Sequence, residues 1–236
     1  MSGKLYLIPV PLSDVAPESV LPATNVEVVR SLRYFVVENL RSARRFLKAC
    51  DRSIDIDSLT IVELNEHTPR EEVAGLLAPV IDGADCGVIS EAGCPGVADP
   101  GADMVALAQR HGVEVVPLVG PSSILMGLMG SGFNGQNFAF LGYLPIEAPK
   151  RAAAMREMQQ RVMRNSQTQI FIETPYRNNR LIRELTTSLP GHMLLCVASD
   201  ITGPRQSIIT RPISEWVSAN YNYDKIPTIF LLYKDV

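Results

Sequence analysis

Strand and helix signals alternate along the first half of the chain. Short apolar runs predict strands at 4–10, 34–37, 61–64, 86–90 and 113–117. Between them, helical periodicity predicts helices at 25–32, 42–50, 69–82 and 103–111, the second of them with Ser42 as its N-cap. A strand followed by a helix, repeated several times, is typical of a mostly parallel sheet in an α/β layer.

The second half of the chain orders its elements differently. Helices are expected at 122–129, 149–164 and 177–188, with strands at 138–141 and 168–173. Strands at 193–199, 206–210 and 228–233 then follow with only a short helix near 214–220, which favours a partly antiparallel sheet. The sequence therefore predicts two α/β domains, 1–117 and 118–236, joined near Pro117–Pro121.

Composition limits the class of protein further. The 236 residues are 46% hydrophobic and 20% charged, which excludes a disordered chain. The apolar stretch 118–129 is broken by Gly120 and Pro121 and is shorter than the ~20 residues of a membrane helix, so no membrane partner is expected. Four cysteines without a CxxC pair and three scattered histidines predict no metal site. The N-terminus is expected to form a strand rather than a signal peptide. Together with the widely spaced cysteines, which suit a reducing compartment, this predicts a cytoplasmic protein.

Basic residues are concentrated in three windows. The net charge is 22 − 25 = −3, which argues against indiscriminate coating of nucleic acid. Nevertheless, residues 30–52, 150–164 and 177–183 together hold fifteen of the 22 basic residues. Solvated helix faces are the ordinary interpretation of any one window. Three windows in an acidic chain favour a polyanionic partner, whose phosphates arginines would bind.

One loop is the most informative motif. Residues 89–101 read Ile-Ser-Glu-Ala-Gly-Cys-Pro-Gly-Val-Ala-Asp-Pro-Gly, after a predicted buried strand and before a helix. Ligands bind at the carboxyl ends of strands in α/β sheets, and glycines let a ligand approach the backbone. The spacing is neither GxGxxG nor GxxxxGK[ST], so a dinucleotide or P-loop site is not supported. A rigid structural turn is the alternative interpretation.

Three further stretches follow the same arrangement. Residues 116–124 end a strand in a Gly-Pro turn before two serines that either cap a helix or bind a ligand. Residues 140–145 read Phe-Leu-Gly-Tyr-Leu-Pro. Residues 171–177 end a strand at Glu173, followed by a Pro turn into a helix that carries arginines. Glu173 is thus either a site residue or a structural cap.

In this order, the four stretches resemble the tetrapyrrole methylase superfamily of S-adenosylmethionine-dependent methyltransferases. Within it the chain is most similar to the branch of ribosomal RNA small subunit methyltransferase I, which methylates a cytidine 2′-hydroxyl. The resemblance runs from Leu5 to Tyr233 and is most specific at 90–101, 116–123 and 140–145. It implies two α/β domains, S-adenosylmethionine in the cleft between them, and a homodimer acting on ribosomal RNA or the small ribosomal subunit.

The resemblance also implies site residues. Those matching the family's cofactor-binding positions are Leu12, Cys94, Gly96, Val97, Ser123, Ile124, Ile172, Ala198, Thr228 and Ile229. Phosphate binding would fall to Arg41, Arg44, Arg45 and Arg177. Methyl transfer from a sulfonium is an in-line displacement that needs no metal, but a ribose hydroxyl needs a base, for which Glu38 and Glu173 are the candidates.

The chain departs from the family pattern on the substrate side. The usual Pro-Ile-Gly-Asn-Leu-like loop is Pro-Val-Pro-Leu-Ser-Asp at 9–14, and the Glu-Asp-Thr-Arg signature is Glu-Asn-Leu-Arg at 38–41. Two alternatives to an RNA 2′-O-methyltransferase therefore stay open. One is a methylase of a tetrapyrrole such as a corrin precursor, and the other is a binding module that has lost catalysis and uses the old cleft for another ligand.

Overall fold

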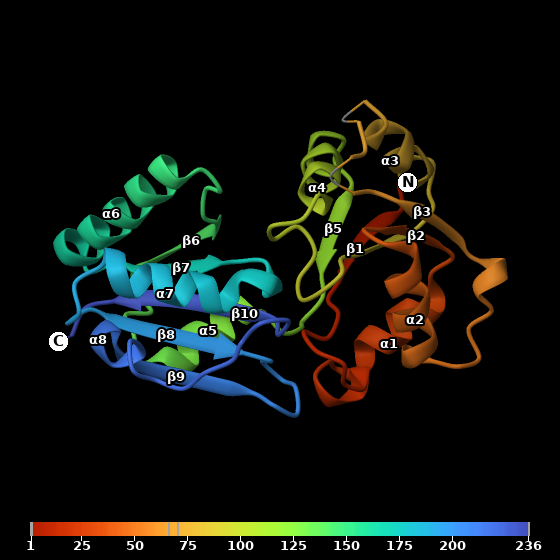
Figure 1. Cartoon of the computed structure of the whole chain (residues 1–236). Coiled ribbons are helices and arrows are strands. Elements are labelled where there is room, and N and C mark those ends of the chain that lie inside the picture. Colours follow the sequence, from red (N-terminus) through yellow and green to blue (C-terminus); the bar gives the residue numbers. More distant parts are fainter. Residues whose placement is uncertain (1, 66, 70, 236) are drawn as a thin grey trace. The chain divides into compact units, whose positions relative to one another are not determined.

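The computed structural model describes residues 2–65, 67–69 and 71–235. It divides into two compact units, Met1–Ser122 and Ser123–Val236, each built around its own sheet (Figure 1). The sequence placed the boundary after Pro117 rather than after Ser122. The connecting residues stay with the first unit because, for example, the N–H of Leu118 donates to the carbonyl of Leu7 at 3.0 Å.

The first unit contains a five-stranded sheet in the order β3-β2-β4-β1-β5, and every pairing in it is parallel. Its strands are β1 (Lys4–Ile8), β2 (Tyr34–Val37), β3 (Thr60–Glu63), β4 (Cys86–Ile89) and β5 (Glu114–Pro117). Its helices are α1 (Ala23–Ser31), α2 (Leu40–Cys50), α3 (Val73–Ile81) and α4 (Gly101–Arg110), with short 3-10 turns at η1 (Pro17–Ser19) and η2 (Ile56–Ser58).

Helices pack on both faces of this sheet. One buried cluster joins Leu77 of α3 and Met104 of α4 to alternate side chains of the strands. The other joins Val29 of α1 and Leu47 of α2 to the opposite side chains, including Phe35 of β2. Because both faces are covered, β2 and β4 are buried along their whole length, as a parallel sheet requires.

Helix α2 begins earlier than its sequence suggested. The expected N-cap was Ser42, but the Asn39 side chain accepts from the N–H groups of Arg41 (3.0 Å) and Ser42 (3.1 Å). Asparagine caps at least as well as serine, and its carboxamide reaches both N–H groups from an extended backbone. This cap places Arg41 in the first turn of α2.

The second unit contains a mixed sheet in the order β6-β7-β10-β8-β9. Only the β6–β7 pair is parallel, and the other three pairs are antiparallel. The strands are β6 (Phe138–Tyr143), β7 (Thr168–Ile172), β8 (Leu194–Ser199), β9 (Ser207–Pro212) and β10 (Thr228–Tyr233). The helices are α5 (Ser123–Ser131), α6 (Ala148–Asn165), α7 (Asn178–Ser188) and α8 (Ile213–Trp216), with η3 at Pro175–Arg177.

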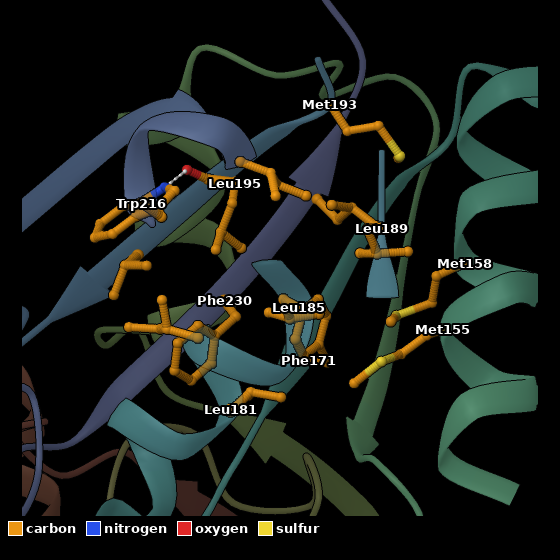
Figure 2. Packing of buried hydrophobic residues seen from close by; sticks show 14 of the residues in the cluster. Met155, Met158, Phe171, Leu181, Leu185, Leu189, Met193, Leu195, Trp216 and Phe230 are labelled. Atoms are coloured by element: carbon orange, nitrogen blue, oxygen red, sulfur yellow. Dashed lines mark hydrogen bonds between the residues drawn. The ribbon is translucent and has the colours of Figure 1, made fainter. Parts of the chain in front are cut away.

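Aromatic and aliphatic side chains fill the core between this sheet and helices α6, α7 and α8 (Figure 2). Phe171 and Phe230 stack with ring centroids 5.8 Å apart. The indole of Trp216 donates to the carbonyl of Leu195 at 3.1 Å, so its one polar group is satisfied inside the core.

Helix α5 lies close to strands β8, β9 and β10. Gly127 permits this approach, since a Cβ there would lie 3.1 Å from Cγ2 of Ile229. The two sheets and their helices confirm the predicted α/β class and the mixed second sheet. None of the described helices combines the length and the apolar character needed to cross a membrane.

Candidate functional site

Two loops meet at the carboxyl edge of the first sheet. Val10, just after β1, and Gly93, in the loop after β4, form an isolated antiparallel bridge. Each N–H donates to the other's carbonyl, at 2.9 and 3.1 Å. The first-strand loop and the Gly/Pro loop of 90–101 are thus held together where parallel α/β sheets place their ligands.

Asp99 fixes the shape of the Gly/Pro loop. Its carboxylate accepts from the N–H of Gly96 at 2.9 and 3.0 Å and from the N–H of Gly101 at 2.7 Å. Burial raises the pKa of this carboxyl above its ordinary value, and the two N–H groups lower it in part. Asp99 is not among the residues predicted from the sequence, although an Asp-Pro pair before a helix is a turn signal.

Glycine is required at the centre of this loop. Gly96 has φ +79°, a conformation that L side chains rarely adopt, whereas the space around it is open, with the nearest atom 4.0 Å from a hypothetical Cβ. Beside it, Val97 is 49% exposed, so its apolar side chain is accessible to a ligand. Backbone atoms and an exposed apolar side chain are therefore both offered to a ligand here.

The other cofactor candidates of the first unit adjoin this loop. Leu12 lies against Gly93, where a Cβ would come within 3.1 Å of Cδ2 of the leucine. The Cys94 thiol donates to the carbonyl of Pro121 at 3.4 Å. Burial raises the pKa of that thiol, so it stays protonated at neutral pH and is no nucleophile.

The candidates of the second unit form a row across its sheet. Ile229 of β10 is the register partner of Ile172 on one side and of Ala198 on the other, with Thr228 next along the strand. Ala198 and Ile229 are buried near Gly127 of α5. Ile172, at the end of β7, is only partly buried. Ser123 and Ile124, also predicted, form the first turn of α5.

The two candidate bases have different surroundings. Glu38 follows β2, and its carboxylate accepts from the N–H of Glu91 at 2.9 Å, at the start of the Gly/Pro loop. Glu173 follows β7 and is 6% exposed. Its carboxylate is bound by Arg151 at 2.9 Å and by Arg177 at 2.8 Å.

The ionisation of Glu173 reflects these contacts. Burial by itself would raise the pKa of the carboxyl group, but the N–H of Thr174 and the guanidinium groups of Arg151 and Arg177 outweigh it. The pKa is therefore lower than its ordinary value. A weak base with both oxygens occupied fits a structural ion pair better than proton abstraction.

The basic windows differ in how their charges are compensated. In the window at 150–164, Arg151 is buried between Glu173 and Glu184 (2.9 and 2.8 Å), and Arg161 pairs with Glu157. On α2, by contrast, Arg41, Arg44 and Arg45 are exposed. Among the residues that the structure describes, these three have no carboxylate within ion-pair distance.

Comparison with known proteins gives a consistent result. No family model matches the chain. Ribosomal RNA small subunit methyltransferase I of Vibrio cholerae is 26% identical over 232 residues, which cover 97% of this chain and 76% of that protein. The enzyme of the same name from Pseudomonas aeruginosa is 26% identical over 98% of this chain and 79% of its own length. One from Streptococcus pyogenes is 29% identical over 91% of this chain and 66% of its own length.

Solved structures of methyltransferases share the architecture. The methyltransferase CobJ superposes over 99% of this chain and 95% of its own, with a TM-score of 0.66 and 16% identity. Uroporphyrin-III-C-methyltransferase from Thermus thermophilus covers 99% of this chain and 93% of its own, with a TM-score of 0.57 and 17% identity. The chain has the tetrapyrrole methylase fold.

These comparisons confirm three of the predictions made from the sequence. The resemblance to ribosomal RNA small subunit methyltransferase I extends over nearly the whole chain. An S-adenosylmethionine-dependent methyltransferase is confirmed as the kind of enzyme, and S-adenosylmethionine as the methyl donor. The individual site residues stay predictions, as do the homodimer and the cleft between the domains.

The residues present fit this donor. Its positively charged sulfur is suited to carbonyl oxygens and apolar walls rather than to a cation, and residues 94–97 have carbonyl groups together with the exposed side chain of Val97. Cys94, Gly96 and Val97 would hold the donor largely through main-chain atoms. Within the described part of the chain, no three His, Cys, Asp or Glu residues are grouped so that they could hold a metal ion.

Proposed function

We propose that this chain methylates RNA of the small ribosomal subunit at a ribose 2′-hydroxyl, with a cytidine as the acceptor nucleotide. The proposal is supported by relatives that are named for the small subunit ribosomal RNA and are similar over 97% and 98% of this chain. The solved methyltransferases, one of which is named for uroporphyrin, are only 16% and 17% identical, so they support the fold alone.

The charges of α2 are the structural observation that best supports an RNA partner. Arg151, Arg161 and Arg177 each pair with a carboxylate of the protein. Arg41, Arg44 and Arg45, in contrast, are exposed and have no carboxylate partner among the described residues. Residues three and four apart lie on one side of a helix, so these three can contact the same phosphate backbone. Arg177 is held against Glu173 and is less suited to this role.

S-adenosylmethionine supplies a methyl group on a positively charged sulfur, which makes the transfer favourable. The chain's task is to hold the acceptor oxygen in line with that methyl group, and well-held reactants gain much of their rate from such positioning. The proton of the hydroxyl must leave, and Glu38, whose carboxylate lies at the start of the Gly/Pro loop against the N–H of Glu91, is the candidate to accept it.

The test uses small ribosomal subunits from a strain that lacks this chain's gene. The purified chain is incubated with them and with donor labelled in its methyl group. A methyl group on the 2′-oxygen blocks alkaline cleavage of the adjoining linkage, so the expected product is a labelled, alkali-resistant dinucleotide identified by mass. Label on a base, or no label in RNA despite donor binding, contradicts the proposal.

The alternatives give different results in the same preparation. A tetrapyrrole methylase would leave the ribosomal RNA unlabelled and transfer label to a uroporphyrinogen or corrin precursor. A binding module without catalysis would show no transfer to either substrate. Calorimetry with S-adenosylmethionine checks separately that the donor binds, and light scattering tests the predicted homodimer.

A further inference from the structure

The first unit contains an open pocket whose lining includes only one residue of the predicted cofactor set, Leu12. Its volume is about 400 Å³, within the range of roughly 300–1,000 Å³ that is usual for small-molecule sites. Three parts of the chain line it: the first-strand loop with η1, one side of α2, and residues 89–92 at the end of β4. It thus lies next to the Val10–Gly93 bridge that joins the two loops.

The lining combines apolar and charged side chains. Phe46 and Ala49 of α2 contribute apolar surface. Arg45, from the same helix, contributes a guanidinium group, while Asp14 and Glu91 contribute carboxylates from the two loops. Arg45, Asp14 and Glu91 are all exposed, so a bound molecule can reach them.

This distribution of charge selects one kind of ligand. Arg45 is one of the three arginines without a carboxylate partner among the described residues, so it can bind an anion. Asp14 and Glu91 accept hydrogen bonds from hydroxyl and amino groups, and Arg45 is the group of this lining that can hold a phosphate. A neutral group rich in such donors and joined to a phosphate satisfies both requirements, and a ribonucleotide has this composition.

We propose that this pocket receives the acceptor nucleotide of the RNA, turned out of its strand, with its phosphate on Arg45 and its sugar and base inside. This inference rests on the proposed function, because it assumes that RNA is the substrate. Enzymes that do chemistry on a base extrude it from stacking into a pocket, and the same turn of the backbone would bring the ribose of the acceptor into this one. Arg41 and Arg44, in the same helix, would then bind the neighbouring phosphates.

The test blocks the pocket and removes its cation separately. Ala49→Trp places a large side chain from an exposed helix position into the pocket, and Arg45→Ala removes the guanidinium. Lys48→Ala is the matched control, because it removes one positive charge from α2 outside the lining. For each variant, kcat and KM are measured with small subunits, and donor affinity is measured by calorimetry.

The expected result separates RNA from the donor. Ala49→Trp and Arg45→Ala each lower kcat/KM for the subunits by roughly tenfold or more, while Lys48→Ala stays within about twofold. Donor affinity is unchanged in all three variants, which also shows that they are folded. Should Ala49→Trp fail to bind donor because it is misfolded, Arg45→Ala against Lys48→Ala decides the question.

Other outcomes overturn the proposal in distinguishable ways. If the wild-type chain methylates RNA and both pocket variants keep its kcat/KM, the pocket does not hold the acceptor although the proposed function stands. If folded pocket variants lose donor affinity as much as activity toward RNA, the pocket belongs to the donor. If the wild-type chain binds donor but never methylates ribosomal RNA, the proposed function and this inference are both wrong.

Discussion

The backbone of Gly96 has a positive φ and open space around it. Replacing it by another residue would therefore cost conformational energy rather than cause a steric clash. We expect Gly96→Ala to lower the free energy of unfolding by about 1–2 kcal/mol, or to shift the loop and weaken donor binding. Urea unfolding and calorimetry measure the two effects. Gly135→Ala is the control, since nothing lies near its Cβ position and its φ is not positive. Equal behaviour of the two variants would contradict the strained conformation.

If the Gly/Pro loop binds the donor as proposed, Asp99 would act on the donor only through the loop that it holds. Asp99→Ala leaves the N–H groups of Gly96 and Gly101 without their acceptor, at a cost of about 1–3 kcal/mol. We therefore expect weaker donor binding and a higher KM for the donor, with a smaller change in kcat. Asp99→Asn keeps one carbonyl oxygen and should restore part of the affinity. Calorimetry that finds the alanine variant unchanged would remove Asp99 from this role.

At the scale of the element, α2 depends on its cap. Asn39→Ala removes the acceptor for the N–H groups of Arg41 and Ser42, and we expect the free energy of unfolding to fall by about 1 kcal/mol. Asn39→Asp keeps an acceptor and should stay close to the wild type. Thermal and urea unfolding provide the measurement. A larger loss in the aspartate variant than in the alanine variant would contradict this account.

Helix α6 is attached to the second sheet through a buried ion pair. Arg151→Met removes the cation that Glu173 and Glu184 share, but Glu173 keeps Arg177 and the side chain of Glu184 is 30% exposed, so we expect a loss of about 2–3 kcal/mol in the free energy of unfolding. Arg161→Met, in the same helix, breaks only the exposed pair with Glu157 and should cost at most about 1 kcal/mol. Urea unfolding of the two variants side by side tests the difference.

The buried carboxyl group of Glu173 also affects the stability of the whole molecule at acidic pH. Because the folded pKa of Glu173 is below its ordinary value of 4.5, the ionised carboxylate stabilises the folded state above that pH. This contribution is lost as the pH falls through the lower, folded pKa. Unfolding free energies measured from neutral pH down to acid should decline, and Glu173→Gln should make the decline shallower. An identical slope in the variant would show that Glu173 does not contribute.

Much of the whole architecture was predictable from the sequence, and the reasons are specific. Apolar runs and turn signals predicted strands at residues 34–37 and 228–233, and the structure has β2 and β10 at those residues. The partners of side chains were not predictable. Arg151 counted as one of a window of surface charges, but it is buried between two carboxylates that lie 22 and 33 residues further along the chain.

The sequence also could not show which of the three basic windows is available to bind a phosphate. Whether an arginine is available to a phosphate depends on which carboxylates the fold brings beside it. The folded structure shows that Arg41, Arg44 and Arg45 of α2 have none among the described residues. The pocket beside α2 is likewise assembled from three segments that are distant in sequence. Such sites depend on topology rather than on local motifs.

The position of β10 has a consequence for how the chain is made. This strand, at residues 228–233, is fully buried between β7 and β8, so the second sheet has a gap in its middle until those residues are available. The first unit, in contrast, has all of its strands by residue 117. During synthesis the first unit can fold while the second is still incomplete, and the nascent second unit must keep the edges of β7 and β8 unpaired until its last strand emerges.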